Sequence, residues 1–235
     1  MNHWKETWNK RDKEIQITDN IFDMFCRLKK ADGYDTLIED GYYEGLFEEW
    51  KRTNEDLSRN GVSFASVYEV GCGSGVNLYL YKNLFNIKKL GGIDYSKPLI
   101  EIAEQVLKDA ELEYGEAVEI DVCSKYDLVL SEGVFIYFQD VQYGMQVFEK
   151  MYEKAEKVVV IKDVYDLEKK DACMAARRAS VENYDERYKG LEKTFYSRDS
   201  FVKFAKEKNC KYSIVEPQNK HYWNNDFTFD FYLFK

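Results

Sequence analysis

The sequence predicts an α/β protein with a doubly wound, mostly parallel sheet. Short apolar segments alternate with amphipathic helical segments from residue 66 to residue 165. Such alternation is typical of βαβ units. The segment 157–165 is apolar enough to be buried on both faces, as strands of parallel sheets are. The 235-residue length fits one domain with a sizeable core.

The first 60 residues are polar and contain no strand-like run, so we expect helices there. Leu46 and Trp50 lie at helical spacing, which predicts an amphipathic helix over 42–57. The pair Asn60-Gly61 is expected to end it, because glycine is common just past a helix end. The following segments predict strands at 66–70, 89–96, 113–120, 126–135 and 157–165, and helices at 75–85, 97–110 and 141–155.

The last third of the chain departs from this alternation. Residues 166–197 are charged and helix-prone, and we interpret them as an insertion after the fifth strand. A helix over 198–209 follows, and then 211–217 and 227–235 predict an antiparallel hairpin at one sheet edge. We therefore expect a single domain in four parts: a helical lid (1–60), a core (61–165), the insertion (166–197), and a closing helix and hairpin (198–235).

Composition excludes several classes of protein. The chain has 34 Lys and Arg and 43 Asp and Glu, a net charge of −9, which argues against a nucleic-acid groove because such grooves cluster basic residues. Neither a bilayer-spanning apolar run nor a signal peptide is recognisable in the sequence. Five widely spaced cysteines form no CxxC pair, so we expect neither a disulfide framework nor a metal site, and a cytoplasmic location.

The most informative motif is Glu69-Val70-Gly71-Cys72-Gly73-Ser74-Gly75, between a predicted strand and a predicted helix. Glycines at such a turn allow a ligand to approach the backbone. A phosphate-binding P-loop is excluded because no Gly-Lys-Ser/Thr follows, and the GxGxxG dinucleotide fingerprint is excluded because residue 76 is Val. Asp94, at the end of the second strand, is placed to accept the hydroxyls of a ribose. The alternative is that it only stabilises the start of the next helix.

These motifs, followed by Gly115-Glu116-Ala117 and the segment YDLVLSEGVF at 126–135, resemble those of the class I S-adenosylmethionine-dependent methyltransferases. The resemblance covers residues 66–166, and within the family it is to small bacterial enzymes that act on small molecules. It implies a Rossmann-like seven-stranded sheet in the order 3-2-1-4-5-7-6 with an antiparallel last strand. It also implies S-adenosylmethionine as cofactor and S-adenosylhomocysteine as product.

The resemblance assigns roles by position. The glycine loop wraps the amino-acid part of the cofactor, Asp94 binds the ribose, and Glu116 accepts the adenine amino group, with Asp121 as the alternative. The full implied cofactor set is Glu69, Gly71, Cys72, Gly73, Asp94, Tyr95, Ser96, Glu116, Ala117, Ser131, Glu132 and Gly133.

An oxygen or nitrogen nucleophile needs a base to remove its proton. His221 follows the sixth predicted strand, and Glu132 and Asp163 end the fourth and fifth, so all three are expected at the edge where ligands bind in such folds. His221 is equally compatible with an exposed loop, and each carboxylate with a structural hydrogen bond. Arg177 and Arg178 either clamp an anionic substrate or form a solvated helix face.

We expect the acceptor to enter between the N-terminal helices and the insertion, against aromatic side chains. The predicted substrate-binding residues are Trp4, Tyr43, Phe135, Tyr165 and Trp223. An aromatic-walled pocket suits a sugar, an amine or a natural-product intermediate. The alternatives are a methyltransferase with a macromolecular substrate and a non-catalytic cofactor-binding protein with the same fold.

Overall fold

The computed structural model describes residues 4–11, 14–34 and 40–235. Its strands are β1 (Ser66–Val70), β2 (Lys89–Asp94), β3 (Glu111–Tyr114), β4 (Tyr126–Glu132), β5 (Ala155–Tyr165), β6 (Lys211–Val215) and β7 (Thr228–Phe234). Its α-helices are α1 (Trp4–Trp8), α2 (Ile21–Ala31), α3 (Tyr42–Arg59), α4 (Val76–Leu84), α5 (Lys97–Val106), α6 (Val141–Lys154), α7 (Lys170–Ser180), α8 (Tyr184–Arg187) and α9 (Arg198–Glu207). Short 3₁₀ helices are η1 (Ala117–Glu119), η2 (Phe135–Tyr137), η3 (Leu167–Lys169) and η4 (Trp223–Phe227).

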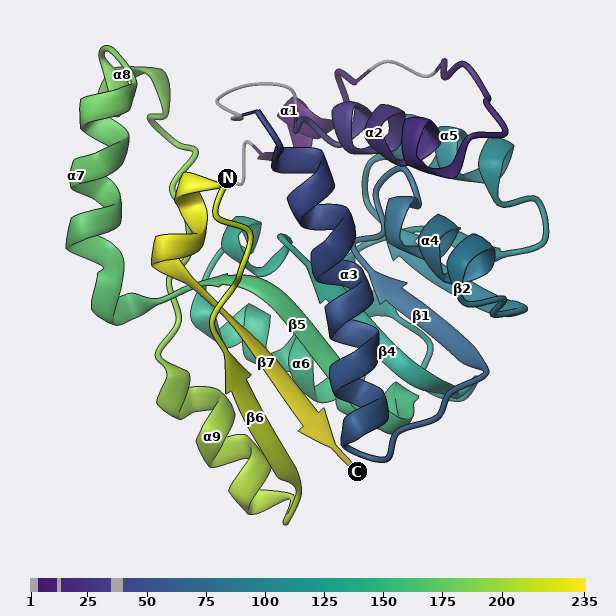
Figure 1. Cartoon of the computed structure of the whole chain (residues 1–235). Coiled ribbons are helices and arrows are strands. Elements are labelled where there is room, and N and C mark those ends of the chain that lie inside the picture. Colours follow the sequence, from purple (N-terminus) through teal and green to yellow (C-terminus); the bar gives the residue numbers. More distant parts are fainter. Residues whose placement is uncertain (1–3, 12–13, 35–39) are drawn as a thin grey trace.

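The strands form one sheet in the order β3-β2-β1-β4-β5-β7-β6. The pairs among β1 to β5 are parallel, and β7 runs antiparallel to both β5 and β6 (Figure 1). This is the order and direction that the resemblance implies, so the predicted fold class is confirmed.

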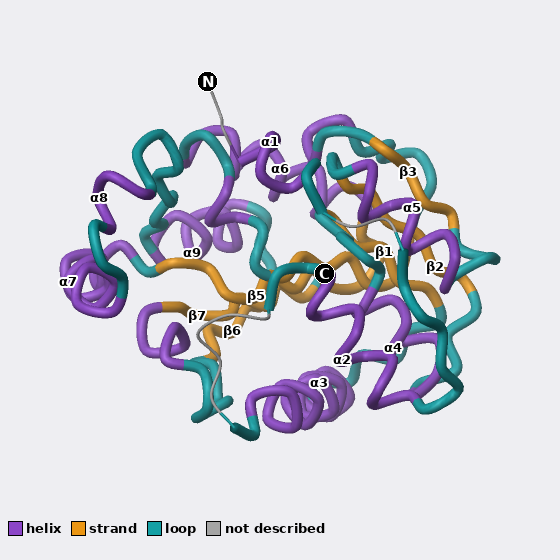
Figure 2. Tube along the Cα trace, turned by 90° about the horizontal axis from the view of Figure 1, so that it is seen from above, coloured by secondary structure: helices purple, strands orange, loops and turns teal. Residues whose placement is uncertain are grey.

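Helices cover both faces of the sheet (Figure 2). Side chains alternate along each strand, so Leu128 and Leu130 of β4 pack on the side of α2 to α5, whereas Val129 packs on the side of α6 and α9. The long helix α3 contributes Trp50 to the first of these cores. It therefore packs on the sheet along with α4, and the predicted lid segment 1–60 is partly a covering layer.

Side-chain hydrogen bonds determine two local features, and the first of them differs from the sequence prediction. The third strand ends at Tyr114 and not at residue 120, because Glu116 and Glu119 form a capping box that starts η1. Ser96 stands at the N-cap position of α5, but its buried hydroxyl donates to the carbonyl oxygen of Trp8 at 3.0 Å and does not cap the helix. Ser96 therefore ties α1 to the start of α5.

Candidate active site

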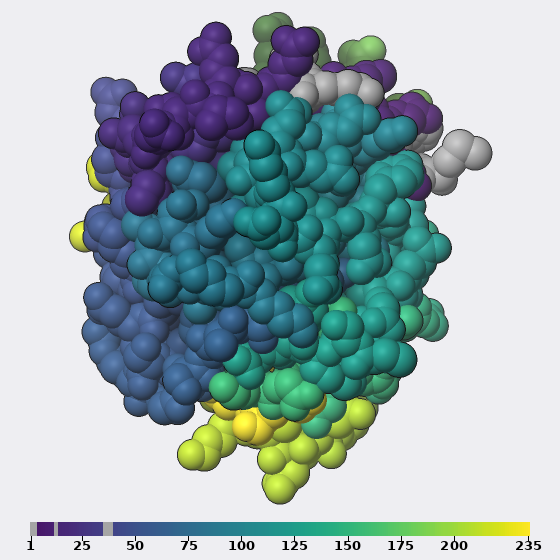
Figure 3. Space-filling view, turned by 90° about the vertical axis from the view of Figure 1, so that its right-hand side faces the viewer, coloured from purple at the N-terminus to yellow at the C-terminus, as the bar shows by residue number. Residues whose placement is uncertain are grey.

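A cavity of about 430 Å³ lies at the carboxyl ends of β1, β2 and β4. Lys5 and Trp8 of the first helix and Lys29, Asp32 and Tyr34 at the end of α2 complete its wall. Figure 3 shows the N-terminal segment, in purple, across the top of the molecule, above the blue and teal segments that follow it in the sequence. The cavity is thus at the strand edge where ligands bind in doubly wound sheets.

The loop after β1 is shaped by close packing. Gly71 and Gly73 have φ of +74° and +51°, in the left-handed region that favours glycine. A Cβ on Gly71 would collide with the side chain of Val134, and a Cβ on Gly73 would lie 2.6 Å from Oδ1 of Asp32. The loop N–H groups of Gly73 and Ser74 donate to Asp94 and Asp32 respectively. Two carboxylates from other parts of the chain, Asp94 at the end of β2 and Asp32 after α2, therefore fix the conformation of the loop beside the cavity.

Asp94 lies at the end of β2 and lines the cavity. It accepts the N–H of Gly73 at 2.9 Å and the N–H of Ser96 at 2.7 Å. Burial raises the pKa of Asp94 to about 6, although these two hydrogen bonds oppose the shift. Each carboxylate oxygen has a second lone pair, so Asp94 is able to accept ribose hydroxyls as well.

Asp32 follows α2 and was not among the sequence-predicted residues. Its carboxylate accepts the Ser74 N–H at 2.8 Å and the Ser74 hydroxyl at 2.9 Å. Burial raises the pKa of Asp32 to about 7, against the effect of these bonds and of the Lys29 charge. Asp32 thus places a titrating group in the cavity wall.

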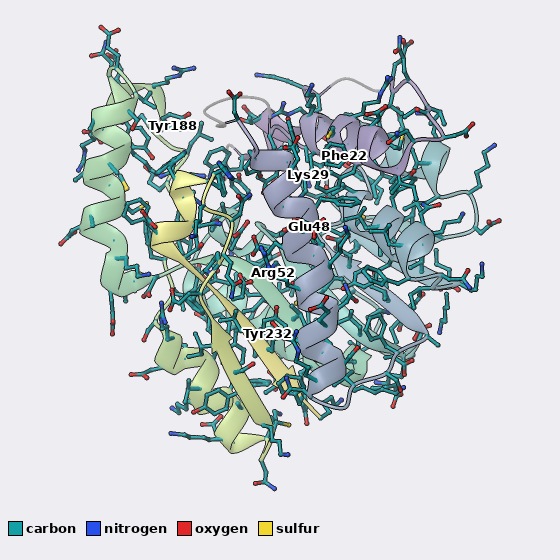
Figure 4. All side chains as sticks on the ribbon, in the orientation of Figure 1. Phe22, Lys29, Glu48, Arg52, Tyr188 and Tyr232 are labelled. Carbon is teal, nitrogen blue, oxygen red and sulfur yellow. The ribbon has the colours of Figure 1, made fainter. Side chains whose placement is uncertain are left out.

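A buried polar network forms the floor of the cavity. Lys29 Nζ donates to Glu132 Oε2 at 2.6 Å, and the Asn77 amide donates both to Glu132 Oε2 at 3.0 Å and to Glu69 Oε1 at 2.6 Å. Figure 4 labels Lys29 between α2 and α3. The two cations Lys29 and Lys162, outweighing burial, lower the pKa of Glu132, whereas burial raises the pKa of Glu69 well above its usual value. The two cations thus favour the charged form of Glu132, whereas burial disfavours the charge on Glu69.

The unused atoms of this network are all acceptors. Glu69 Oε2, Asn77 Oδ1 and Glu132 Oε1 are buried and have no hydrogen-bond partner among the described residues. All three residues line the cavity. A cationic donor fits such a cluster, because buried acceptors without partners are costly. The ammonium of an amino-acid ligand such as S-adenosylmethionine has this chemistry.

The opposite end of the cavity is bounded by Tyr95, Glu116 and Ala117. Lys5 forms an ion pair with Glu116 and lies 5.9 Å from the centre of the Tyr95 ring. Asp121, the alternative for the adenine contact, is exposed and accepts the N–H groups of Cys123 and Ser124. Of the two acids, Glu116 is the one that lines the cavity.

The structure brings most of the predicted cofactor residues to this cavity. Glu69, Gly71, Cys72, Gly73, Asp94, Tyr95, Glu116, Ala117, Glu132 and Gly133 line it. Ser96 and Ser131 are buried and outside the lining. Gly133 has a φ of +66°. A Cβ on this residue would lie 2.8 Å from the hydroxyl of Tyr34.

The three candidate bases lie in different surroundings. Glu132 is held in its ion pair with Lys29. His221 is exposed outside the cavity lining, with its ring against Gly41. Asp163 sits at a bulge of β5 with φ +57°, beside the carboxyl ends of β4 and β5. Burial, and then the nearby Glu132, raise the pKa of Asp163 well above its usual value.

The predicted substrate-binding residues lie outside the cavity lining. Phe135 is buried among Phe138, Tyr196 and Phe201, and Tyr43 packs against Tyr42. Tyr165 and Trp223 lie against Arg177 of α7 instead. Trp4 is in edge contact with the cavity residue Tyr137.

The sequence interpretation missed Lys29, Asp32 and Asn77. A signal for two of them was present: residues 22, 25, 29 and 32 continue one apolar stripe at spacings of three and four, and charged residues in such a stripe point to a buried polar site. In the described part of the chain, no three His, Cys, Asp or Glu side chains gather as metal ligands. Within the same residues, no helix combines the length and apolarity needed to cross a membrane.

Comparison with known proteins agrees with this geometry. Residues 68–154 match the family model of a methyltransferase domain. An uncharacterized protein of Rickettsia prowazekii is 34% identical over 73 residues, which span 31% of this chain and 28% of that protein. The chain thus covers less than a third of the length of this relative.

Solved structures show the same fold at low identity. The plantazolicin methyltransferase BpumL, solved with a desmethyl-plantazolicin analogue and S-adenosylhomocysteine, has a TM-score of 0.62 at 15% identity, covering 91% of both chains. An S-adenosylmethionine-dependent methyltransferase from Clostridium acetobutylicum has a TM-score of 0.62 at 16% identity, covering 89% of this chain and 98% of that one. Residues 68–154 thus match a methyltransferase domain, and the chain shares the fold of solved S-adenosylmethionine-dependent methyltransferases.

Proposed function

We propose that this chain binds S-adenosylmethionine in the cavity and transfers its methyl group to an oxygen or nitrogen nucleophile of a small molecule. The observation that carries the proposal is the set of buried acceptors on Glu69, Asn77 and Glu132 beside the glycine loop. They fit the ammonium group of the cofactor, with Asp94 positioned for the ribose and Glu116 for the adenine. The cofactor supplies an activated methyl group, and the protein positions the acceptor for in-line attack.

A small acceptor is favoured over a macromolecule by the shape and charge of the site. The cavity is walled by aromatic side chains from α1 and η2, including Trp8 and Tyr137, and the chain carries a net charge of −9. The solved complex of the plantazolicin methyltransferase holds a desmethyl-plantazolicin analogue, which is consistent with a natural-product acceptor.

Among the three candidate bases we favour Asp163. Its raised pKa makes its carboxylate a stronger proton acceptor than an ordinary aspartate. Asp163 is outside the cavity lining, but its charge interacts with those of the lining residues Glu132 and Tyr34. Glu132 is held as an anion by Lys29, and His221 lies on the exposed side of the loop. The role of Asp163 is to take the proton that the nucleophile loses.

The cofactor proposal is tested by isothermal titration of S-adenosylmethionine and S-adenosylhomocysteine into the chain in the presence of EDTA. Binding of both is expected, with a stoichiometry of one. A metabolite screen with methyl-labelled cofactor then identifies the acceptor. Binding without any transfer would favour the non-catalytic alternative, and the absence of binding would overturn the proposal.

The choice of base is tested with the acceptor that the screen identifies. Asp163→Asn is expected to lower turnover by about 10²–10⁴-fold, the usual contribution of a general base. His221→Ala serves as the comparison and is expected to keep turnover near normal. Cofactor affinity should stay unchanged in both variants. If His221→Ala lowered turnover and Asp163→Asn did not, His221 would be the general base.

A further inference from the structure

Two cationic side chains of the insertion meet at one aromatic cluster. Arg177 belongs to α7, and Lys193 lies in the segment between α8 and α9 (Figure 1). The guanidinium carbon of Arg177 is 5.3 Å and the Lys193 Nζ 5.6 Å from the centre of the Tyr165 ring. Lys193 Nζ also lies 4.8 Å from the Trp4 ring and 4.6 Å from the Tyr137 ring.

Hydrogen bonds of the residues on either side of Lys193 hold it beside the cofactor cavity. The indole N–H of Trp4 donates to the Glu192 carbonyl oxygen at 3.1 Å, and the Thr194 N–H donates to the Ile136 carbonyl oxygen at 3.0 Å. The Thr194 hydroxyl donates to the Phe138 carbonyl oxygen at 2.6 Å. Both neighbours of Lys193 are thus anchored, one of them on η2, whose Tyr137 lines the cavity.

Arg177 is held equally firmly. Its Nη2 donates to the Tyr165 hydroxyl and, at 3.0 Å, to Asn224 Oδ1. Its guanidinium lies 4.9 Å from the Trp223 ring. The Nε–H of Arg177 is buried and has no partner among the described residues.

Within the part of the chain that the structure describes, the two cations have no acidic counterpart. Among the described residues, no carboxylate forms an ion pair with Arg177 or with Lys193, whereas the adjacent Arg178 is exposed and paired with Asp185. Burial, and then the charge of Arg177, lower the pKa of Lys193 to about 7. Partly buried cations without an anion are costly, and an incoming anion would remove that cost.

We propose that Arg177 and Lys193 form an anion site that anchors a carboxylate of the methyl acceptor. The rings of Trp4, Tyr137 and Tyr165 form the wall against which a planar apolar body packs. Because it names a feature of the acceptor, this inference rests on the proposed function. The carboxylate is the anchor, and the nucleophile is directed past Tyr137 toward the methyl group.

The site is tested with benzoate as probe, titrated into the chain saturated with S-adenosylhomocysteine and also into the chain alone. Phenyl phosphate reports whether a phosphate is accepted instead, and benzyl alcohol and benzylamine are the neutral and cationic controls. We expect benzoate to bind at millimolar concentration at least about tenfold more tightly than the other three, since hydrogen bonds to charged groups have about this effect.

Arg177→Gln and Lys193→Gln are each expected to weaken benzoate binding about tenfold or more. Arg178→Gln, one residue along the same helix, is the matched control and should leave it unchanged. Arg177→Lys keeps the charge, so its affinity for benzoate should lie between that of the unchanged chain and that of Arg177→Gln. The affinity for S-adenosylhomocysteine should be the same in every variant, which also shows that each is folded.

Three results would overturn the anion site: benzylamine binding as tightly as benzoate, benzoate binding that survives both substitutions, or no benzoate binding at millimolar concentration. Tighter binding of phenyl phosphate would overturn the carboxylate assignment. Failure of the proposed function has a different signature, because S-adenosylhomocysteine would then not bind while benzoate still bound the chain alone.

Discussion

At the scale of single residues, Asp94 shows how one carboxylate serves both the fold and the ligand. It accepts two backbone N–H groups that define the glycine loop and the start of α5, and it still faces the cavity. The sequence could predict its ligand role from its place at the end of a strand. The sequence could not predict the bond to Gly73, because it depends on how the loop folds back over β2.

Asp94→Ala is expected to weaken S-adenosylhomocysteine binding by about 1.5–3 kcal/mol, the range for hydrogen bonds to a charged group. Titration calorimetry measures this loss. Asp109→Ala, at an exposed position, is the control and should leave binding unchanged. An unchanged affinity in Asp94→Ala would place the ribose elsewhere.

Asp32 gives the site a dependence on pH. Its pKa of about 7 means that a rise from pH 6 to pH 8 converts a neutral wall group into an anion. S-adenosylmethionine carries a net positive charge, so its affinity should increase with pH across this window. Asp32→Asn keeps the acceptor for the Ser74 N–H and lacks the titration, so its affinity should be flatter across the same range. Titrations at several pH values decide the point, and identical pH profiles for both proteins would contradict the assignment.

At the scale of elements, the pair Lys29–Glu132 joins α2 to the end of β4 across 103 residues of sequence. Both side chains are 2% exposed. Removing one partner leaves the other as a buried charge without compensation, which is much worse than losing a surface ion pair. The pair therefore fixes where α2 lies over the cavity.

Lys29→Met is expected to lower the free energy of unfolding by about 3–5 kcal/mol, as for other broken buried pairs. Urea unfolding measures the change. Lys30→Met, on the exposed side of the same helix, is the control and should change stability little. In the double variant Lys29→Met/Glu132→Gln, part of the loss should return. A small effect of Lys29→Met alone would mean that Glu132 is neutral in the fold.

The elements could be predicted to different degrees. The parallel strands and the helices α3, α5 and α6 follow from apolar spacing, and their predicted positions agree closely with the structure. The third strand is shorter than predicted because the reciprocal bonds of Glu116 and Glu119 start a 3₁₀ turn. Lys29 could have been suspected from the stripe on α2, but its partner Glu132 lies 103 residues away and could not be inferred. Asn77 was missed because no local pattern reports its contacts with Glu69 and Glu132.

At the scale of the whole molecule, segments distant in sequence close around one cavity. The sheet order that brings β1, β2 and β4 together came from the family resemblance, and it is confirmed. The position of the N-terminal segment could not be inferred from the family resemblance. Trp8 reaches the site because the Ser96 hydroxyl binds its carbonyl oxygen, a contact over 88 residues.

A ligand in this cavity contacts α1, α2, the glycine loop and η2 at once, so it should stabilise the fold as a unit. At a ligand concentration one hundred times the dissociation constant, the gain is about 2.7 kcal/mol, which corresponds to a rise in Tm of roughly 5–11 °C for a chain of this size. Thermal unfolding with S-adenosylhomocysteine measures the shift, and Asp94→Ala at the same ligand concentration should show a smaller one. A Tm that stays constant at saturating ligand would contradict the view that these distant segments close around the cofactor.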